Sequence, residues 1–397
     1  MMRNVRWAWV GFTVCLLLMT PYLLGPPGRR VAQDNTGATK HAGADAIHAP
    51  HVGGSLTERA RATPSQGTSS SRRDTIATAH AAGRAGSAAP LAASQEAMSS
   101  MAAARRGRLR AMWKDFGRAA TASTAGREMP AVRDANGLIS DEIVHNARAS
   151  WKQFVATMPA YPSRSMTAES GANTGDPTGD GALDGDGNTT LFAGRGIVMA
   201  GGGYHLDWVY ATASLLRSYG CVLPIELWVS SGRGEMPDHA AIRNLTTLGV
   251  TVGDVDSIAN VFPAMGAQLN PLDAQTKPYI IKQVALVSAA CRVCLLLDAD
   301  NTPLRDPAYL LEDRRFLDTG LLLWPDFWHM RAGPASIRRI FQLSQGWGNL
   351  PDMRTVESGQ IVVDKRRAWA TLMLSTYMQL HTEFFDNQVH ESRGSEP

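Results

Sequence analysis

From residue 196 onward, short apolar runs alternate with segments of helical periodicity, and this alternation constrains the fold more than any other feature. The helical segments are amphipathic, and the clearest covers 206–219, with a second at 277–290. Apolar strands joined by such helices predict an α/β fold with a mainly parallel central sheet and helices on both faces. The expected strands cover residues 196–200, 225–229, 250–252, 293–297, 320–324 and 360–363.

Two of these strands end in residues that suit a ligand. In open α/β sheets, ligands bind beyond the carboxyl ends of the strands, where this chain has Gly201-Gly202-Gly203 and Asp298-Ala299-Asp300. Residues two apart on an extended segment point the same way, so Asp298 and Asp300 face one spot. Two such carboxylates are costly unless a cation neutralises them. A hard divalent ion that bridges a diphosphate fits them, and a strand end capped by turn-forming Asp and Asn is the alternative.

The N-terminus carries an uncharged stretch, Trp7 to Gly25, that follows two arginines. A helix of this length would span about 28 Å, close to the hydrocarbon thickness of a bilayer. No small-residue cleavage pattern follows the stretch. We therefore expect residues 7–25 to be an uncleaved transmembrane signal anchor, with a cleaved signal peptide as the alternative.

The segment between the anchor and the folded domain has a different composition. Residues 26–135 consist largely of Ala, Ser, Thr, Gly and Arg and show no apolar periodicity. Such a segment cannot bury enough apolar surface to offset its ordering entropy, so we expect a disordered stem. Residues 136–397 then form the folded domain, with a core at 194–380 and an amphipathic helix at 137–158.

Charge and cysteine content argue against two kinds of partner. The chain has 39 basic and 36 acidic residues, and a net charge of +3 gives no reason to expect a nucleic acid. Cys291 and Cys294 form a single C-x-x-C, whereas a structural zinc site needs about four ligands. A redox role is open in principle. Burial beside a core strand is favoured, with one free thiol among these two cysteines and Cys221.

The residues around the acidic motif make it specific. The segment from Leu295 to Pro307 reads LLLDADNTPLRDP and resembles the signature of the fungal α-mannosyltransferase family, glycosyltransferase family 71. Further stretches resemble the family's motifs in the same order between residues 194 and 380. These stretches are Gly196 to Gly202, Leu216 to Gly220, Leu223 to Leu227, Tyr279 to Lys282, Leu323 to Trp328, Glu357 to Gln360, and Asp364-Lys365.

The resemblance implies a GT-A-like nucleotide-diphospho-sugar transferase fold and a role for each matching residue. Asp298 and Asp300 would bind a divalent metal, Mn²⁺, together with the donor diphosphate. The other implied roles are donor binding by Gly201, Gly202 and Lys282, acceptor binding by Trp324, Trp328 and Gln360, and catalysis by Glu357 and Asp326. Each role has a structural alternative. Gly201 and Gly202 could form an ordinary strand-to-helix turn, and Lys282 could be a solvated helix lysine. The segment from Trp324 to Trp328 could be a packed turn around Pro325, and Glu357 could be a strand-edge glutamate.

The resemblance also implies a Golgi membrane protein of single-pass type II topology, with residues 1–6 as its cytoplasmic tail. It would add α-linked mannose from GDP-mannose to a glycan acceptor with retention of configuration. A transferase that uses a UDP-sugar and a catalytically inactive, membrane-tethered glycan-binding relative are the alternatives. Asn188 and Asn244 begin N-glycosylation patterns, which agree with a lumenal domain.

The end of the chain departs from the family pattern. The family has a further strand and a Gly-Asp-Lys type turn after the helix that ends near Leu380, and this sequence has no counterpart of that turn. We therefore expect a truncated C-terminus. His381 and His390 are the candidates to replace a metal ligand from the missing turn.

Overall fold

The computed structural model describes residues 89–127, 139–162, 191–269, 280–329, 339–342 and 354–381. The predicted anchor, Asn188 and His390 lie outside these residues. Among the helices that are described, none combines the length and the apolar character needed to cross a membrane. All contacts discussed below lie within residues 96–397, which belong to one compact unit.

The central sheet has the strand order β3-β2-β1-β4-β8-β5. The four strands from β3 to β4 are parallel, whereas β8 is antiparallel to both β4 and β5. The prediction of a mainly parallel sheet is confirmed, but the reversal at β8 was not predicted. The strands are β1 (Arg195–Ala200), β2 (Ile225–Val229), β3 (Val250–Asp254), β4 (Val293–Leu297), β5 (Leu321–Leu322) and β8 (Gln360–Asp364).

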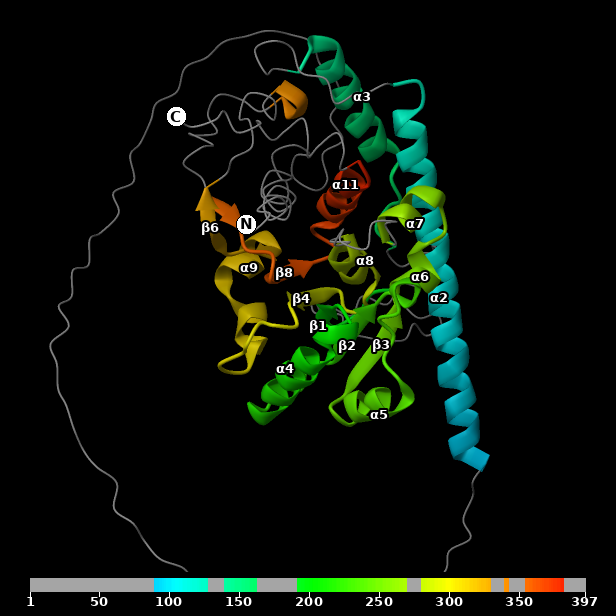
Figure 1. Ribbon diagram of the computed structural model, residues 1–397, viewed down its shortest axis with the longest axis vertical. Coiled ribbons are helices and arrows are strands. Elements are labelled where there is room, and N and C mark those ends of the chain that lie inside the picture. The colour runs from blue at the N-terminus through cyan, green and yellow to red at the C-terminus, as the bar shows by residue number, and fades with distance from the viewer. Residues whose placement is uncertain are drawn as a thin grey trace, which may run out of the picture. The chain divides into compact units, whose positions relative to one another are not determined.

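Helices cover both faces of the sheet, as predicted (Figure 1). Side chains of β4 alternate between two cores: Leu295 and Leu297 pack into one, and Cys294 and Leu296 into the other. This alternation is the period of two expected of a strand buried on both sides. The first core includes α4 (Leu206–Ser218), α5 (His239–Thr247) and α9 (Arg314–Thr319). The second includes α6 (Val255–Ala259), α7 (Pro263–Leu269), α8 (Ile280–Ser288) and α11 (Trp369–Leu380).

Two helices from the N-terminal part of the folded unit complete the second core. The predicted helix at 137–158 is confirmed as α3 (Asp141–Thr157), which begins where the Ser140 hydroxyl accepts from the amide of Ile143. Its buried Phe154 ring stacks on Tyr377 of α11. Tyr377 also hydrogen-bonds to Ser150 of α3, so α3 and α11 are joined by both packing and polar contacts.

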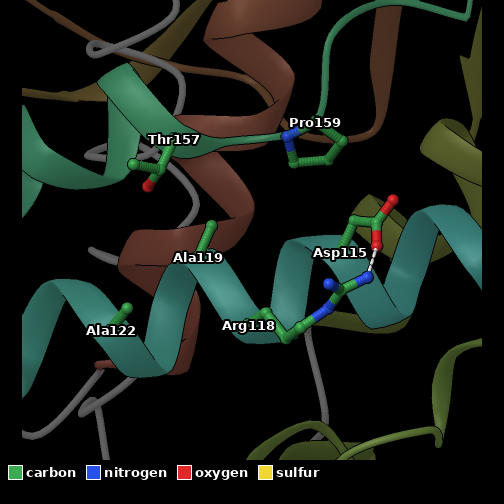
Figure 2. A pocket seen from close by; sticks show the side chains of 6 residues that line it. All are labelled: Asp115, Arg118, Ala119, Ala122, Thr157 and Pro159. Carbon is green, nitrogen blue, oxygen red and sulfur yellow. Dashed lines mark hydrogen bonds and ion pairs between the residues drawn. The ribbon is translucent and has the colours of Figure 1, made fainter.

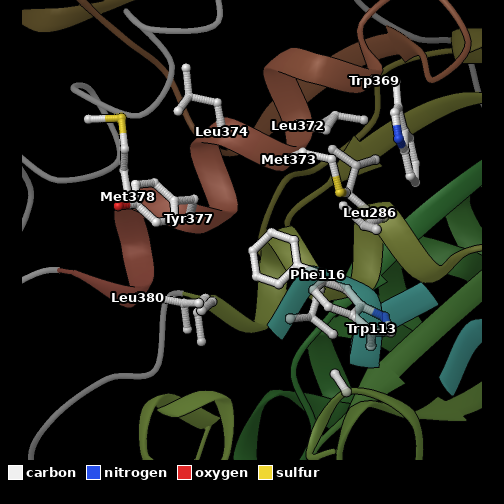
Figure 3. Close-up of a cluster of buried hydrophobic side chains, with 14 of the residues drawn as sticks. Trp113, Phe116, Leu286, Trp369, Leu372, Met373, Leu374, Tyr377, Met378 and Leu380 are labelled. Atoms are coloured by element: carbon white, nitrogen blue, oxygen red, sulfur yellow. The ribbon is translucent and has the colours of Figure 1, made fainter. Parts of the chain in front are cut away.

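The prediction of a disordered stem through residue 135 is wrong for the segment that forms α2 (Ala89–Thr124). From residue 109 this helix buries one side in the second core, and Figure 3 shows its Trp113 and Phe116 beside Leu286 of α8. The Trp113 indole also donates to the Ser288 hydroxyl at 3.1 Å. The buried stripe consists of Leu109, Met112, Trp113, Phe116, Ala119 and Ala120. This is helical spacing, but it is short and interrupted by Arg, Lys and Gly, so the composition of the surrounding segment hides it.

The cysteines of the folded unit behave as buried residues. Cys291 and Cys294 form a disulfide at the start of β4, and Cys221 is a buried free thiol. One free thiol and burial beside a core strand were both predicted. The adjacent turn holds Lys365, which is fully buried and donates to the carbonyl oxygens of Val287 and Ala289 at the end of α8. A lysine in this position satisfies carbonyls that the helix leaves without partners.

Candidate active site

The acidic loop, residues Asp298 to Asn301, leaves the carboxyl end of β4 and is held by main-chain hydrogen bonds. The amide of Asp298 donates to the carbonyl of Gly359 at 2.8 Å, and the amide of Asn301 donates to the carbonyl of Asp298 at 3.1 Å. The Asn301 side-chain amide donates to the same Gly359 carbonyl at 2.6 Å. The turn before β8 therefore fixes both ends of the acidic loop.

At Gly359 the lack of a side chain allows a close approach to two side chains of the site. A Cβ atom at this position would lie 2.9 Å from Asn301 Nδ2 and 3.1 Å from Glu357 Oε1. The Glu357 carboxylate also accepts from the Gly359 amide at 2.8 Å, so the glutamate folds back over the turn. The structure thus brings the predicted Glu357 next to the acidic loop. Neither Asn301 nor Gly359 was predicted as a site residue.

Lys282, another predicted site residue, contacts the acidic loop from α8. Its ammonium lies 2.6 Å from Asp298 Oδ2, and both side chains are mostly buried. Burial raises the pKa of the Asp298 carboxyl above its ordinary value, Lys282 opposes this, and the charges of Asp300 and Glu357 raise it further. Asp298 is therefore acted on by one lysine and by two further carboxylates.

This arrangement fits a divalent cation in its chemistry. Carboxylate oxygens are hard ligands, and a second positive charge would offset the mutual repulsion of these carboxylates. Within the described ranges no three His, Cys, Asp or Glu side chains form a preformed metal cluster. Magnesium-like sites are commonly held by one or two carboxylates and completed by substrate phosphates, so Asp298 and Asp300 would be the residues to hold such an ion.

The helix after β1 supports the acidic loop from the opposite face of the sheet. The buried Thr212 hydroxyl of α4 lies 2.9 Å from the Ala299 carbonyl oxygen and 3.3 Å from that of Asn301. Thr212 was not predicted as a site residue. Its helix was predicted, but the contact joins residues 87 positions apart, and nothing local in the sequence indicates it.

The glycine turn after β1 lies close to a second loop. Gly201 and Gly203 have positive φ angles of 119° and 58°, and a Cβ on Gly202 would lie 2.3 Å from the Glu235 carbonyl oxygen. Side chains at these positions would strain the backbone or collide with it. The turn therefore needs its glycines for packing, whether or not a nucleotide approaches it.

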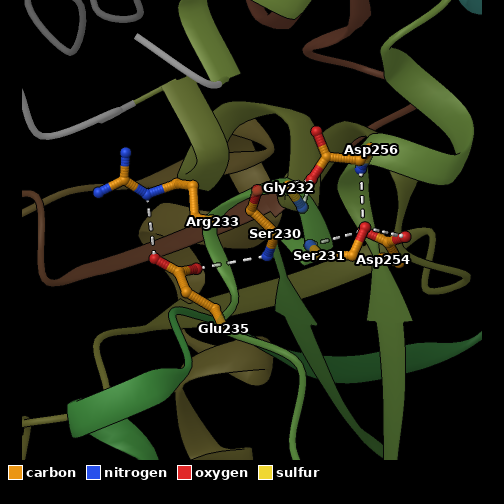
Figure 4. Close-up of polar contacts among 7 residues, drawn as sticks. All are labelled: Ser230, Ser231, Gly232, Arg233, Glu235, Asp254 and Asp256. Carbon is orange, nitrogen blue, oxygen red and sulfur yellow. Dashed lines mark hydrogen bonds and ion pairs between the residues drawn. The ribbon is translucent and has the colours of Figure 1, made fainter. Parts of the chain in front are cut away.

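The loop that meets this turn is a network of polar contacts between the ends of β2 and β3 (Figure 4). The Ser230 hydroxyl donates to Asp256 at 2.5 Å, and the Ser231 hydroxyl donates to Asp254 at 2.8 Å. The Glu235 carboxylate accepts from the Ser230 amide and pairs with Arg233. The network fixes the loop beside the glycine turn at the carboxyl edge of the sheet.

The remaining predicted residues lie along the chain segments that flank β8. Gln360 pairs with Leu297, the last residue of β4, and is therefore adjacent to the acidic loop. The Trp324 carbonyl accepts from the Glu357 amide at 2.9 Å, while the Trp324 side chain is partly buried against the first core. Asp326 and Trp328 lie in β6 (Pro325–His329), which forms a two-stranded ribbon with β7 (Arg354–Val356). The Trp328 side chain is outside the described part.

Two other features lie away from this edge. An open hollow between α2 and α3 is lined by Asp115, Arg118, Ala119, Ala122, Thr157 and Pro159, none of which belongs to the acidic loop or its contacts (Figure 2). His381, a candidate metal ligand, packs its ring against Tyr377, and burial lowers its pKa to about 4. Its Nε2 atom is buried without a hydrogen-bond partner. His381 has no recorded contact with the acidic loop.

Comparison with known proteins identifies relatives of this domain. Residues 194–345 and 341–396 match the protein family described as "Mannosyltransferase putative", and together they cover more than half of the chain. The alpha-1,2-mannosyltransferase MNN2 of Saccharomyces cerevisiae is 25% identical over 224 residues, which are 48% of this chain and 36% of the relative. MNN5 of the same yeast is 27% identical over 238 residues, 48% of this chain and 39% of the relative.

A Candida albicans protein gives a similar match. The alpha-1,2-mannosyltransferase MNN21 is 25% identical over 237 residues, 48% of this chain and 34% of the relative. The chain spans between about a third and two fifths of the length of these three relatives.

Proposed function

The chain belongs to the mannosyltransferase family that its residues 194–396 match, and from this premise we propose that it is a glycosyltransferase that moves mannose from GDP-mannose to a glycan acceptor. The observation that carries the proposal is the acidic loop. Asp298 and Asp300 stand at the exit of a buried strand, within the matched region, and are held there by Gly359 and Thr212. The curated relatives are named alpha-1,2-mannosyltransferases, which supports mannose as the transferred sugar.

In this proposal Asp298 and Asp300 hold a divalent cation, Mn²⁺, which would neutralise the donor diphosphate as it leaves. Lys282 is close enough to the same carboxylates to contribute positive charge to the phosphates. The glycine turn gives the nucleotide access to main-chain amides at the neighbouring strand end. A GT-A-like arrangement of donor and sheet agrees with the observed mixed sheet.

The transfer is proposed to retain the α configuration of mannose. Glu357 is the carboxylate best placed to act near the reacting sugar, since it lies in the turn that holds the acidic loop. Asp326 is the second candidate, on the ribbon that leads to the same turn. The acceptor is proposed to contact Gln360, Trp324 and Trp328. Because the Trp324 side chain is partly buried, only its exposed part is available to the acceptor.

We also propose a Golgi location with single-pass type II topology. The support is the uncharged stretch Trp7 to Gly25 and the N-glycosylation pattern at Asn244, whose side chain is exposed on α5. Glycosidase sensitivity and protease protection of the full chain in intact vesicles would test this. A domain that faces the cytoplasm would contradict the topology.

The enzymatic proposal is tested by donor hydrolysis with the purified full chain. We expect Mn²⁺-dependent release of GDP from GDP-mannose, loss of activity with a chelator, and little activity with UDP-galactose or UDP-glucose. Preference for a UDP-sugar would transfer the proposal to that donor. Absence of hydrolysis with every donor, in a chain that binds manno-oligosaccharide, would replace it with an inactive glycan-binding protein. Asp300→Ala should abolish turnover without unfolding the domain, and full activity in this variant would refute the metal assignment.

A further inference from the structure

Trp208 differs from the other tryptophans of the folded domain in its exposure. Its side chain is 55% exposed, although it lies in a regular helix, α4, that packs on the central sheet. Of the other tryptophans whose side chains are described, Trp113, Trp151, Trp228 and Trp369 are buried and Trp324 is partly buried. An indole left in water on a regular helix presents a large apolar face and an N–H donor, which together suit a sugar ring.

The contacts of Thr212 give the position of Trp208 relative to the acidic loop. Trp208 precedes Thr212 by four residues, so the two side chains lie on neighbouring positions of the same helix stripe. The Thr212 hydroxyl donates to the Ala299 carbonyl under the acidic loop. Since α4 begins just after the carboxyl end of β1, Trp208 stands one turn nearer the carboxyl edge of the sheet than Thr212, on the side of α4 that meets the acidic loop. Lys282 reaches the same loop from the α8 side.

A second exposed aromatic ring lies just before the start of α4. Tyr204 belongs to the 3-10 turn Gly203–His205, is 76% exposed, and its ring centroid lies 3.9 Å from that of His205. An exposed indole face matches a pyranose ring, whose C–H face is apolar.

The side of α4 that carries Trp208 and Thr212 favours a sugar ring over the nucleobase as the ligand. Thr212 contacts the loop at the end of β4, where the acidic loop would hold the diphosphate. The hydrogen-bonding loop at Ser230 and Glu235 lies on the other side of the glycine turn, next to β2. A base would find its polar partners there. The indole instead borders the space beside the acidic loop where a sugar would react.

We propose that Trp208 forms one wall of a subsite for a hexopyranose ring at the rim of the acidic loop. The subsite rests on the proposed function, although binding of a sugar ring can be measured without catalysis. The ring belongs either to the glycan acceptor or to the sugar of the donor. Both are hexopyranose rings, and binding experiments distinguish the two.

The test compares Trp208→Ala and Trp208→Phe with a matched control, Tyr210→Ala, in the full chain. Tyr210 is 45% exposed on the same helix and points about 200° away around the axis. Binding of a manno-oligosaccharide and of GDP would be measured by calorimetry or saturation-transfer NMR, and the KM for GDP-mannose by GDP release. Circular dichroism would verify folding of each variant.

A wall for the acceptor predicts that Trp208→Ala weakens oligosaccharide binding about tenfold with unchanged GDP affinity. A wall for the donor sugar predicts a similar rise in the KM for GDP-mannose, again with unchanged GDP affinity. Trp208→Phe should retain most of either interaction, and Tyr210→Ala should change neither.

Several results would overturn the subsite. These are weaker GDP binding in Trp208→Ala, equal losses in Tyr210→Ala, no change in any sugar measurement, or a wild-type chain that binds no sugar. The outcomes for the two proposals stay separate. If wild type binds the oligosaccharide through Trp208 but does not hydrolyse GDP-mannose, the subsite stands and the proposed function fails.

Discussion

The hydroxyl of Thr212 in α4 donates to the carbonyl oxygen of Ala299, the central residue of the acidic loop, at 2.9 Å. This bond crosses from a helix on one face of the sheet to the residue between the two proposed metal ligands. It is buried, so water cannot replace it at low cost. The contact therefore sets the position of the acidic loop without touching a substrate.

Removal of this hydroxyl should weaken metal binding in a domain that still folds. Thr212→Val keeps the side-chain shape, and we expect Mn²⁺ affinity and Mn²⁺-dependent donor hydrolysis to fall about tenfold to a hundredfold, as for other residues that orient ligands. The free energy of unfolding should fall by about 1–3 kcal/mol, a loss of similar size. Thr212→Ser, which restores the donor, is the control. Equal Mn²⁺ affinity in the Val and Ser variants would show that the bond does not position the loop.

A side chain at Gly359 should distort the site directly. In Gly359→Ala the new Cβ would lie 2.9 Å from Asn301 Nδ2 and 3.1 Å from Glu357 Oε1, so one of these groups must move. We expect strong loss of donor hydrolysis with a folded domain. Gly107→Ala is the matched control, since no atom lies within 4 Å of a Cβ there and alanine favours its helix by up to about 1 kcal/mol. Unchanged activity in Gly359→Ala would contradict the required close approach.

His381 should make stability fall in mild acid. Burial lowers its native-state pKa to about 4, from an ordinary value of 6.5. Between these values the unfolded state binds more protons than the native state, so stability rises with pH across this window and is lost as pH falls. The full shift corresponds to about 3 kcal/mol. Urea unfolding at pH 7 and pH 4.5 would measure it.

His381→Gln removes the titrating group and should flatten the pH dependence of stability in the same window. The comparison of slopes matters here, because carboxylates also titrate near pH 4. An identical slope in wild type and variant would place the acid sensitivity elsewhere.

Helix α2 should contribute to the stability of the folded domain. Trp113→Ala removes a fully buried side chain that packs against α8, and we expect a loss of about 3–5 kcal/mol in the free energy of unfolding. Its exposed neighbour supplies the control, since Lys114→Ala should change stability by less than about 0.5 kcal/mol. A deletion through residue 135 should likewise expose the second core. A loss below about 1 kcal/mol in Trp113→Ala would show that the packing of α2 does not stabilise the domain.

Local sequence predicted the main strands of the sheet. The apolar runs that form β1, β2 and β4 are short, which favours strands over helices, and the run that forms β1 is followed by a helix with its own apolar face. Asp298 and Asp300 could be selected as candidates because they directly follow a buried strand, at the edge of the sheet where ligands bind. The structure places both in a turn after Leu297, closed by the bond from the Asn301 amide to the Asp298 carbonyl, so the strand period expected to aim both carboxylates at one spot does not extend to them. The stretches around these two residues also occur in the same order as the motifs of the family, which supports the same selection.

Pairings between distant residues were decided only by the tertiary structure. The Asn301–Gly359 bond joins residues 58 positions apart, and the reversed direction of β8 follows from how the chain returns to the edge of β4. Lys282 could be placed on a helix from its neighbours, but its ion pair with Asp298 depends on how α8 packs against the sheet.

For helix α2 the sequence predicted disorder, whereas the tertiary structure contains a helix. Its apolar stripe is too short and its composition too rich in Ala and Arg to predict a stable segment, and it is ordered where α3, α8 and α11 cover it. The sequence by itself thus determined the main strands of the sheet and the helices that became α3, α4 and α8, because these depend on local periodicity. The supports from Thr212, Gly359 and α2 required the folded structure, because burial makes those contacts favourable only after distant parts of the chain have met.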